Sequence, residues 1–527
     1  MIEFVQRHAE KITGWMSGFD RLWFRGTLRL IASVGGLLSY MRYRGGGGGI
    51  LHKDFGTWSQ GITEAVKEGG RAAMEQAGGK VFYLGRSGAS KEDKARQIAA
   101  ERGIREGPVC LLETLEMGQS YEMHRDREKK LLVLEPRPRL SLHQYSYWMD
   151  REVGMCHVRV QSWLPLNVFI SMNGREWLCR SLDQAGVRYQ RRDNALVWVQ
   201  DMEKARALLA LQLKTPWEAL LGRLLERANP VLAGLLKLDQ EPLRRYWSLE
   251  QSEWATDILF KQARELEGLY PMWARQAILG AGSVDVMRFL GMRVNKDGRV
   301  PERFAREVIS DLKLREEGMR VKHRVGNNSV KLYNKQGSVL RTETTIHDPR
   351  GLKVYRGTEE APEDKRWRPV RKGVADLYRV AEIGEKSNQR YLSFLSQVQC
   401  EEKLGEVMAP VCRRVQVKGK RYRGLSPMEP ADRALLLAVG QGQWSIRGFT
   451  NGELRQVLGG AARGDARETQ RQRGRMSRQL ALLRAHGIIK RVSGTRRWIL
   501  TRKGRQIVTL TAAANHASAK ELMQRAA

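Results

Sequence analysis

The stretch LLRAHGIIKRVSGTRRWILTRKGR, residues 482–505, decides how the C-terminal part of this chain is expected to fold. Its leucines belong to the end of a helix, and Gly487 is a typical stop because glycine accepts the left-handed conformation that follows many helices. Two short apolar runs, Ile488–Val492 and Trp498–Leu500, are separated by the turn residues Ser493–Thr495. The stretch therefore predicts a helix end followed by a β-hairpin.

Two more helices are predicted upstream of this stretch. Residues 431–439 have the apolar spacing of a helix. Thr450 and Glu453 stand at the positions of a capping box, which opens a second, short helix. After a glycine-rich spacer, Gly459–Gly464, a long third helix leads into the quoted stretch. Three helices followed by a hairpin is the order of a winged helix-turn-helix domain, which we expect over residues 425–527.

The charges of this domain favour contact with nucleic acid. Residues 471–505 contain twelve Lys or Arg and no Asp or Glu. The planar fork of arginine matches the acceptors of guanine, and cations beside phosphates supply most of the affinity for nucleic acid. We therefore expect nucleic-acid contacts from arginines on the third helix and on the hairpin, which forms the wing: Arg471, Arg473, Arg475, Arg478, Arg496 and Arg497.

The quoted stretch resembles the recognition-helix end and wing of MarR-type winged-helix proteins, over about eighty residues of the chain. The resemblance implies the fold of this domain and no function for the remaining residues. A winged helix that contacts another protein is the alternative for this part of the chain.

The 527-residue chain is strongly basic. It has 92 Lys and Arg against 58 Asp and Glu, a formal net charge of +34. Such a field draws polyanions, so nucleic acid is the first candidate partner and an anionic membrane surface the second. A solvated basic surface with no specific partner is the alternative. The length suggests about three domains.

The sequence also argues against several classes of protein. No C-x-x-C pair occurs among the five cysteines, and scattered thiols fit a reducing cytosol. Charged residues interrupt the first apolar segment, and no run of eighteen apolar residues exists, so we expect a cytoplasmic protein with no membrane partner. No P-loop, Rossmann fingerprint or G-x-S-x-G motif is present, and no cofactor is evident apart from Mg²⁺ if the protein is a nuclease.

The body of the chain is expected to be α+β. A helix is predicted over Ile12–Leu22 and a flexible loop at Gly45–Gly49. Short strands alternate with helices at Lys91–Arg102 and Arg175–Gln184, which favours a mainly antiparallel sheet. We expect five regions: an N-terminal helical region 1–80, an α+β domain 81–200, a helical region 201–317, a β-meander plus helix 318–410, and the winged helix-turn-helix domain 425–527.

The segment SGFDRLWFRGTLR, residues 17–29, mixes basic and aromatic side chains. The residues concerned are Asp20, Arg21, Trp23, Phe24, Arg25 and Arg29. Basic residues interleaved with aromatic ones can stack bases or follow a phosphate backbone. An Asp–Arg pair within an amphipathic core helix is the alternative.

A stripe of carboxylates is expected on a helix over Glu250–Glu267. Glu250, Glu253 and Asp257 are spaced by three and four residues, which would align them on one helical face. Two such carboxylates could bind a metal ion. The alternative is that they are solvated or paired, since Lys261 stands four residues beyond Asp257.

Residues 318–347 switch to period two and predict a three-stranded meander. In its first strand Arg320, Lys322 and Arg324 alternate with apolar residues and histidine, so one face of that strand is entirely basic. We expect this face to bind nucleic acid.

The second and third strands of the meander, KLYNK and SVLRTETTI, are similar to a Y-x-K … L-R-x-E hairpin in plasmid and phage replication initiators and related mobile-element proteins. The resemblance implies one site formed by Lys331, Tyr333, Lys335, Arg341 and Glu343. In such a site the basic residues bind nucleic acid, the glutamate holds Mg²⁺ and the tyrosine is the nucleophile. The H-x-H metal motif of rolling-circle initiators is absent, and a cross-strand Lys–Glu or Arg–Glu pair is the alternative.

The whole chain also resembles a group of large bacterial open reading frames associated with mobile elements, through SGFDRLWFRGTL, QSEWATDI and the meander. Our leading hypothesis is a nucleic-acid-binding protein of a mobile element, acting on DNA or RNA or within a ribonucleoprotein. Its enzymatic version adds metal-dependent strand cleavage or transfer at Glu343, helped by Asp257 as a second metal ligand. The alternative is a transcriptional regulator with a large sensing domain. The basic strand and the basic run Lys418–Arg423 favour the first hypothesis.

Overall fold

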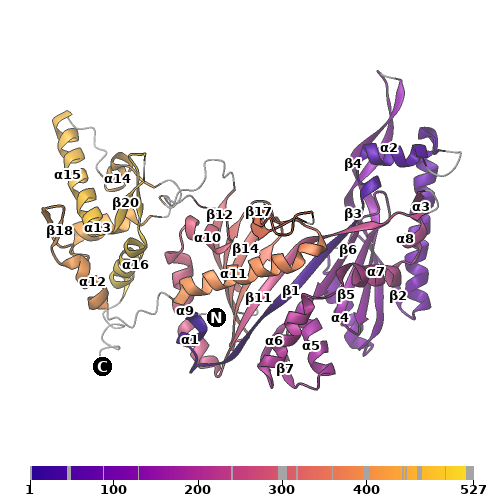
Figure 1. The fold of residues 1–527 in the computed structure, drawn as a ribbon, viewed down its shortest axis with the longest axis horizontal. Coiled ribbons are helices and arrows are strands. Elements are labelled where there is room, and N and C mark those ends of the chain that lie inside the picture. Colours follow the sequence, from indigo (N-terminus) through magenta and orange to yellow (C-terminus); the bar gives the residue numbers. More distant parts are fainter. Residues whose placement is uncertain are drawn as a thin grey trace. The chain divides into compact units, whose positions relative to one another are not determined.

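The computed structural model describes residues 3–43, 49–86, 88–128, 130–238, 241–292, 294, 306–315, 318–358, 360–396, 404–441, 444, 448–459, 466–492 and 494–517. Most of the predicted loop Gly45–Gly49 and of the predicted spacer Gly459–Gly464 lies outside the described residues. The chain divides into two compact units built from segments that are distant in sequence (Figure 1). Unit 1 comprises residues 1–11, 262–337 and 386–527, and unit 2 comprises residues 12–261 and 338–385.

Unit 2 is an α+β body around a large sheet (Figure 1). Its strands are β1 (Ile12–Leu28), β2 (Lys80–Gly85), β3 (Gly107–Asp126), β4 (Leu131–Asp150), β5 (Gly154–Gln161), β6 (Val168–Asn173), β7 (Tyr189–Arg192), β8 (Ala195–Val199), β9 (Lys237–Leu238), β10 (Glu241–Pro242), β11 (Arg245–Phe260), β15 (Val339–Ile346), β16 (Lys353–Arg356) and β17 (Arg366–Pro369). Its helices are α2 (Val34–Tyr43), α3 (Phe55–Gln76), α4 (Lys91–Glu101), α5 (Gly174–Gln184), α6 (Met202–Gln212), α7 (Trp217–Ala228), α8 (Val231–Gly234), the short η1 (Arg29–Ile31), η2 (His52–Asp54) and η3 (Val374–Asp376), and the first part of α11 (Leu377–Ser396).

The unit 2 sheet follows the order β15-β11-β1-β6-β5-β4-β3-β2. Its neighbours pair antiparallel, apart from the parallel pair β2 and β3. The predicted α+β class and the mainly antiparallel sheet are therefore confirmed. Two predicted helices in this unit are also confirmed as α4 and α5. The side chain of Ser90 accepts a hydrogen bond from the amide of Asp93, and Asn173 caps α5 in the same way.

Two other predicted helices are wrong. Residues 12–22 and 250–260 lie in β1 and β11, which pair with each other along most of their length. The region 201–317, expected to be helical, therefore contains β11 and also β12 (Val308–Arg315). The cause is a β-bulge at Asp20, where the pairing steps from Phe19 opposite Trp254 to Arg21 opposite Glu253. The extra residue reverses the alternation of faces, so the buried apolar side chains Met16, Phe19 and Leu22 follow one another at intervals of three residues, as they would on a helix.

Helix α5 begins directly against this bulge. A Cβ atom on Gly174 would lie 2.1 Å from the carbonyl oxygen of Phe19, closer than any side chain can approach a backbone atom. Glycine at this position therefore allows the start of α5 to contact the backbone of β1.

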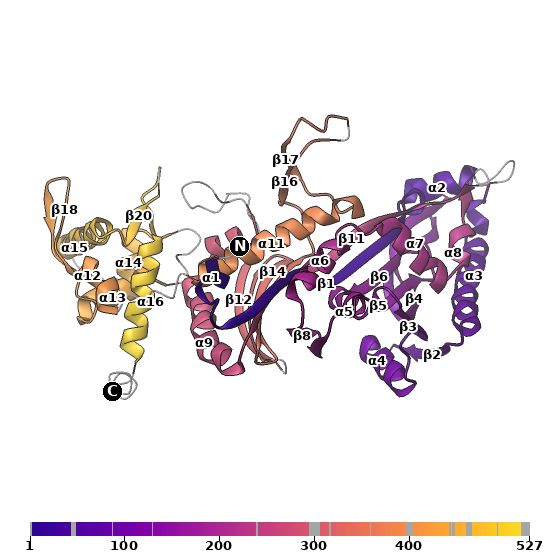
Figure 2. The same ribbon diagram turned by 60° about the horizontal axis from the view of Figure 1, so that its bottom comes forward.

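The two faces of the unit 2 sheet are covered differently. On one face α7 packs against β1, with the rings of Phe24 and Trp217 5.3 Å apart, and α3 lies beside α8 (Figure 1 and Figure 2). On the other face α6 covers one end of β1, where Leu209 packs against Gly18, and α4 covers part of β3. Between these helices part of the second face stays open, and Trp23 is 37% exposed there.

Unit 1 combines antiparallel strands with many helices. Its strands are β12 (Val308–Arg315), β13 (Gly318–Val325), β14 (Asn328–Lys335), β18 (Val415–Val417), β19 (Lys420–Tyr422), β20 (Ile489–Arg491) and β21 (Trp498–Leu500). Its helices are α1 (Glu3–Arg7), α9 (Ala263–Gly280), α10 (Ser283–Phe289), the end of α11, α12 (Leu404–Cys412), α13 (Pro430–Val439), α14 (Asn451–Val457), α15 (Ala466–Ala485) and α16 (Arg502–His516). The three strands predicted within residues 318–347 are present as β13, β14 and β15.

Residues 404–517, called the C-terminal module below, enclose a core of their own. Buried side chains of α12 to α16 and β20 form it, including Leu436, Phe449 and Leu483. The predicted helices are present as α13, α14 and α15. The capping box is also present, since Thr450 Oγ1 accepts from the amide of Glu453 and Glu453 accepts from the amide of Thr450. The hairpin β20–β21 follows α15.

We expect Gly174→Ala to lower the free energy of unfolding by about 1–3 kcal/mol, because the added methyl group forces α5 away from β1. Urea denaturation followed by circular dichroism measures the change. The matched control is Gly222→Ala in α7, where a Cβ meets nothing within 4 Å. That substitution should stabilise the protein by about 0.4–1 kcal/mol. Equal effects of the two substitutions would contradict the contact at the bulge.

Candidate functional site

Three carboxylates from neighbouring strands meet in unit 2. Asp20 of β1, Glu253 of β11 and Glu343 of β15 each offer an oxygen within 4.8 Å of the other two. The register of β11 places Glu253 opposite Arg21, and Ala255, two residues further on, opposite Glu343. Because residues two apart on a strand share a face, the two glutamates lie on the same face of the sheet. Carboxylate oxygens in this arrangement are suitable ligands for Mg²⁺ or Ca²⁺.

Two buried arginines hold the acidic side chains of this cluster. The Nε and Nη2 atoms of Arg341 lie 2.6 and 2.9 Å from the two carboxylate oxygens of Asp257, a two-pronged ion pair. Nη1 of Arg341 is 3.2 Å from Asp20, and Nη2 of Arg175 is 3.1 Å from Asp257. All four side chains are at least nine-tenths buried. Their positions are therefore fixed by charge pairing inside the protein.

The charges of the cluster act on one another, because the carboxylates of Asp20 and Asp257 lie beside the guanidinium groups of Arg341 and Arg175. Burial raises the pKa of Asp20, Arg341 lowers it, Glu343 raises it, and the net direction is upward. Burial lowers the pKa of Arg175, although Asp257 acts in the other direction. Burial also opposes the charge of Arg341, but Asp257 and Asp20 outweigh it and raise its pKa.

Asp257 and Arg341 occupy places that the sequence did not predict. Asp257 was expected on a helix as a metal ligand beside Glu343, but it lies on β11, is fully buried and pairs with two arginines. Arg341 was expected to contact nucleic acid, but it is only 1% exposed. The structure therefore gives both residues a positioning role within the cluster.

The five residues of the site implied by the replication-initiator resemblance lie on two strands. Arg341 and Glu343 lie on β15 of unit 2, whereas Lys331, Tyr333 and Lys335 lie on β14 of unit 1. These three residues of β14 are buried. Arg175 was not singled out from the sequence, because the pattern of the first turn of α5 does not distinguish an inward from an outward arginine.

The basic face predicted for β13 is present in unit 1. Arg320 and Lys322 lie opposite Tyr333 and Lys331 of β14, so these side chains share one face, while Arg324 is exposed. Burial lowers the pKa of Lys322, and the positive charges of Lys331 and Arg320 lower it further. Asp311 acts in the opposite direction on Lys322, and its carboxylate lies 3.5 Å from Arg320.

The arginines of the C-terminal module fall into two groups. Arg471, Arg473, Arg475 and Arg478 of α15 are exposed, as is Arg496 beside β21. Arg497 instead lies 2.8 Å from the Glu453 carboxylate of the capping box and donates to the carbonyl of Gly448. The first group can contact a partner, whereas Arg497 ties the hairpin to α14.

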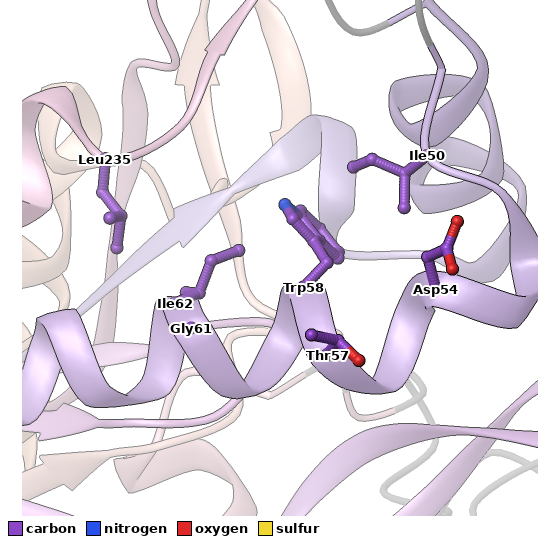
Figure 3. A pocket seen from close by; sticks show the side chains of 7 residues that line it. All are labelled: Ile50, Asp54, Thr57, Trp58, Gly61, Ile62 and Leu235. Atoms are coloured by element: carbon purple, nitrogen blue, oxygen red, sulfur yellow. The ribbon is translucent and has the colours of Figure 1, made fainter.

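A hollow of about 630 Å³ lies at the start of α3 (Figure 3). Its lining residues are Ile50, Asp54, Thr57, Trp58, Gly61, Ile62 and Leu235. Asp54 is the one ionisable group among them, so the hollow offers no set of groups for catalysis.

Comparison with known proteins identifies no relative. No family model, curated protein or solved structure matches the chain. Within the described residues, no helix combines the length and the apolar character that crossing a membrane requires.

We expect Asp432→Asn to weaken the C-terminal module by about 1 kcal/mol at neutral pH, since Asp432 is buried and accepts hydrogen bonds from Arg423 and the amide of Ser426. Pairing with Arg423 lowers the pKa of Asp432 below its ordinary 3.8, despite burial. The stabilisation is therefore complete above about pH 4 and is lost as pH falls through the lower, folded-state pKa.

Hydrogen exchange of the α13 amides in the full-length protein measures this effect. The control is Glu429→Gln, which changes an exposed acid in the same loop. A difference between wild type and Asp432→Asn that persists unchanged at pH 2 would contradict the ion pair.

Proposed function

We propose that the chain is a nucleic-acid-binding protein in which the C-terminal module is a winged helix-turn-helix that holds a duplex. The observation that carries the proposal is a stripe of exposed arginines on α15. Arg467, Arg471, Arg475 and Arg478 are spaced by four, four and three residues, which places them along one side of a helix. Met476, Leu480 and Leu483 are buried in the core of the module. A helix with one packed side and one cationic side suits the major groove.

Helical geometry indicates that the predicted arginines of α15 contribute unequally to DNA binding. At 3.6 residues per turn, Arg475 and Arg478 lie within about 40° of Arg471 around the helix axis, whereas Arg473 lies about 200° from Arg471. Arg473 is exposed, but it points to the other side of the helix. The stripe should therefore contact DNA while Arg473 does not.

The hairpin β20–β21 would act as the wing beside this helix. Arg491 and Arg496 are exposed on it, in a position suited to phosphate or minor-groove contacts. The ion pair between Arg497 and Glu453 connects the wing to α14. The wing is thereby held in a defined orientation relative to the helices.

The setting that we propose is a mobile element, as the sequence resemblance implies, with DNA or RNA as the partner. A transcriptional regulator is the competing proposal. A regulator needs little basic surface outside its DNA reader, whereas β13 carries Arg320, Lys322 and Arg324 on one face. This basic face supports the first setting.

We expect Arg475→Ala and Arg478→Ala each to weaken duplex binding by about 1–3 kcal/mol and to reduce the slope of log K against log salt by about one. Fluorescence anisotropy with a labelled 20-base-pair duplex at several salt concentrations measures both quantities. The matched control is Arg473→Ala, which removes the same charge from the other side of α15 and should have a small effect. Equal losses from all three substitutions would refute the groove orientation.

Metal-dependent strand cleavage is a second proposal, and the meeting of Asp20, Glu253 and Glu343 favours it. These side chains would hold Mg²⁺, which polarises a scissile phosphate and lowers the pKa of a bound water. Asp257, Arg175 and Arg341 would keep the carboxylates in place. This assignment replaces the predicted pair of Glu343 and Asp257, since both carboxylate oxygens of Asp257 pair with guanidinium groups.

We expect Glu343→Gln to abolish Mg²⁺-dependent cleavage of labelled single- and double-stranded DNA and RNA while leaving their binding intact. Gel electrophoresis of the products, with EDTA in a parallel reaction, measures cleavage. Glu218→Gln, an exposed acid on α7, is the control and should cleave as wild type does. Cleavage that survives EDTA or Glu343→Gln would rule out the carboxylate cluster.

A further inference from the structure

The open part of the unit 2 sheet carries a compact set of aromatic and basic side chains. It is formed by β1, β6 and β5, which are neighbours in the sheet (Figure 1). Arg21 and Trp23 are exposed, and the other members are partly exposed. We call the set the sheet platform, and its residues are Arg21, Trp23, Arg25, His157, Arg159 and Phe169.

Strand register arranges the platform in two rows. Phe169 of β6 lies opposite Arg25 of β1 and opposite Arg159 of β5, so two arginines flank one ring. In the next row Ser171 of β6 lies between Trp23 and His157. Residues opposite one another on adjacent strands share a face, and diagonal neighbours such as Trp23 and Phe169 lie about 7–8 Å apart. The two rings can therefore serve neighbouring bases of one strand.

The two arginines of the first row are held in place and retain donors. The guanidinium carbons of Arg25 and Arg159 lie 5.7 and 5.1 Å from the centre of the Phe169 ring. Arg25 donates to Asn167, and Arg159 pairs with Glu116 at 3.0 Å. Their Nε groups are buried and make no hydrogen bond to any described residue, so contact with a phosphate would fall to the Nη groups, which carry four of the five donor hydrogens of a guanidinium group.

His157 adds an uncharged ring to the platform. Burial lowers its pKa to about 4, and the nearby charges of Arg21 and Arg159 act in the same direction, with Glu92 opposing them. At neutral pH the imidazole is therefore a neutral aromatic surface.

We infer that the sheet platform binds single-stranded nucleic acid, with bases stacked on Trp23 and Phe169 and phosphates beside Arg21, Arg25 and Arg159. The inference rests on the proposed function and adds a second nucleic-acid-binding surface, which prefers single-stranded nucleic acid to a duplex. Aromatic rings on an open sheet reach only unstacked bases, because the bases of a duplex are covered by their neighbours. Arg21 lies 3.7 Å from Glu92 and Arg159 lies 3.0 Å from Glu116, so the three arginines exceed these two paired acids and leave a positive charge for a phosphate backbone.

One end of the platform borders the carboxylate cluster. Glu253 lies opposite Arg21, and its carboxylate belongs to the group formed with Asp20 and Glu343. The end of the platform at Arg21 therefore lies next to the carboxylates that we propose to hold Mg²⁺.

The test compares Trp23→Ala with a matched control in the full-length protein. Trp198 of β8 is 39% exposed, close to the 37% of Trp23, and lies outside the platform. The probes are fluorescein-labelled dT and U oligonucleotides of twelve residues and a 20-base-pair duplex. We expect Trp23→Ala to weaken binding of at least one single strand on the order of tenfold, with duplex binding unchanged. Trp198→Ala should bind all probes as wild type does, and Trp23→Phe should restore most of the affinity.

Ultraviolet cross-linking followed by mass spectrometry tests the same surface in the wild-type protein. We expect cross-linked peptides that contain residues 21–25 or 157–171. Unchanged binding of both single strands by Trp23→Ala, an equal loss in Trp198→Ala, or cross-links confined to α15 would overturn the inference. None of these outcomes argues against the proposed duplex site at Arg475 and Arg478, and cross-links on α15 would support it, so the failure of the platform is distinguishable from the failure of the duplex site.

Discussion

The ion pairs of Arg341 are the interaction on which the centre of unit 2 depends. One buried guanidinium bonds to Asp257 of β11 and to Asp20 of β1 from its own strand β15, so three adjacent strands are joined by charge as well as by backbone hydrogen bonds. Removing one partner of a buried ion pair lowers the free energy of unfolding by more than the intact pair contributes to it, since the remaining charge stays desolvated. The residue types at Arg341, Asp257 and Asp20 are therefore required for the stability of the fold, independently of any reaction at the site.

Helices could be predicted from the sequence where capping residues mark the position at which the helix begins. Ser90 and Asn173 begin α4 and α5, and the capping box at Thr450 begins α14. These features act within a few residues, so no tertiary information is needed to recognise them. The strands β1 and β11 could not be recognised in this way. The bulge at Asp20 breaks the period-two pattern, and the carboxylates of β11 imitate a helical stripe.

The candidate site was predictable only in part. Glu343 was identified from a resemblance within its own hairpin, and Glu253 from a pattern that proved to be a strand. Their association with Asp20 joins residues more than 300 positions apart, and only strand order brings them together. The base-stacking hypothesis for residues 17–29 was made on an assumed helix. On the observed strand, Arg21, Trp23 and Arg25 share one face, and Phe24 turns to the other face to pack on Trp217.

The bulge at Asp20 also restricts how β1 can change in length. Before the bulge, the even-numbered residues Gly14 and Gly18 lie on the face of the sheet that α6 covers. After the bulge, the odd-numbered Trp23 lies on this same face, in the part that no helix covers. Deleting one residue there would turn the aromatic and basic side chains inward and the apolar ones toward solvent. Related chains should therefore keep the number of residues between these glycines and the tryptophan constant, and accept insertions only beyond the ends of the strand.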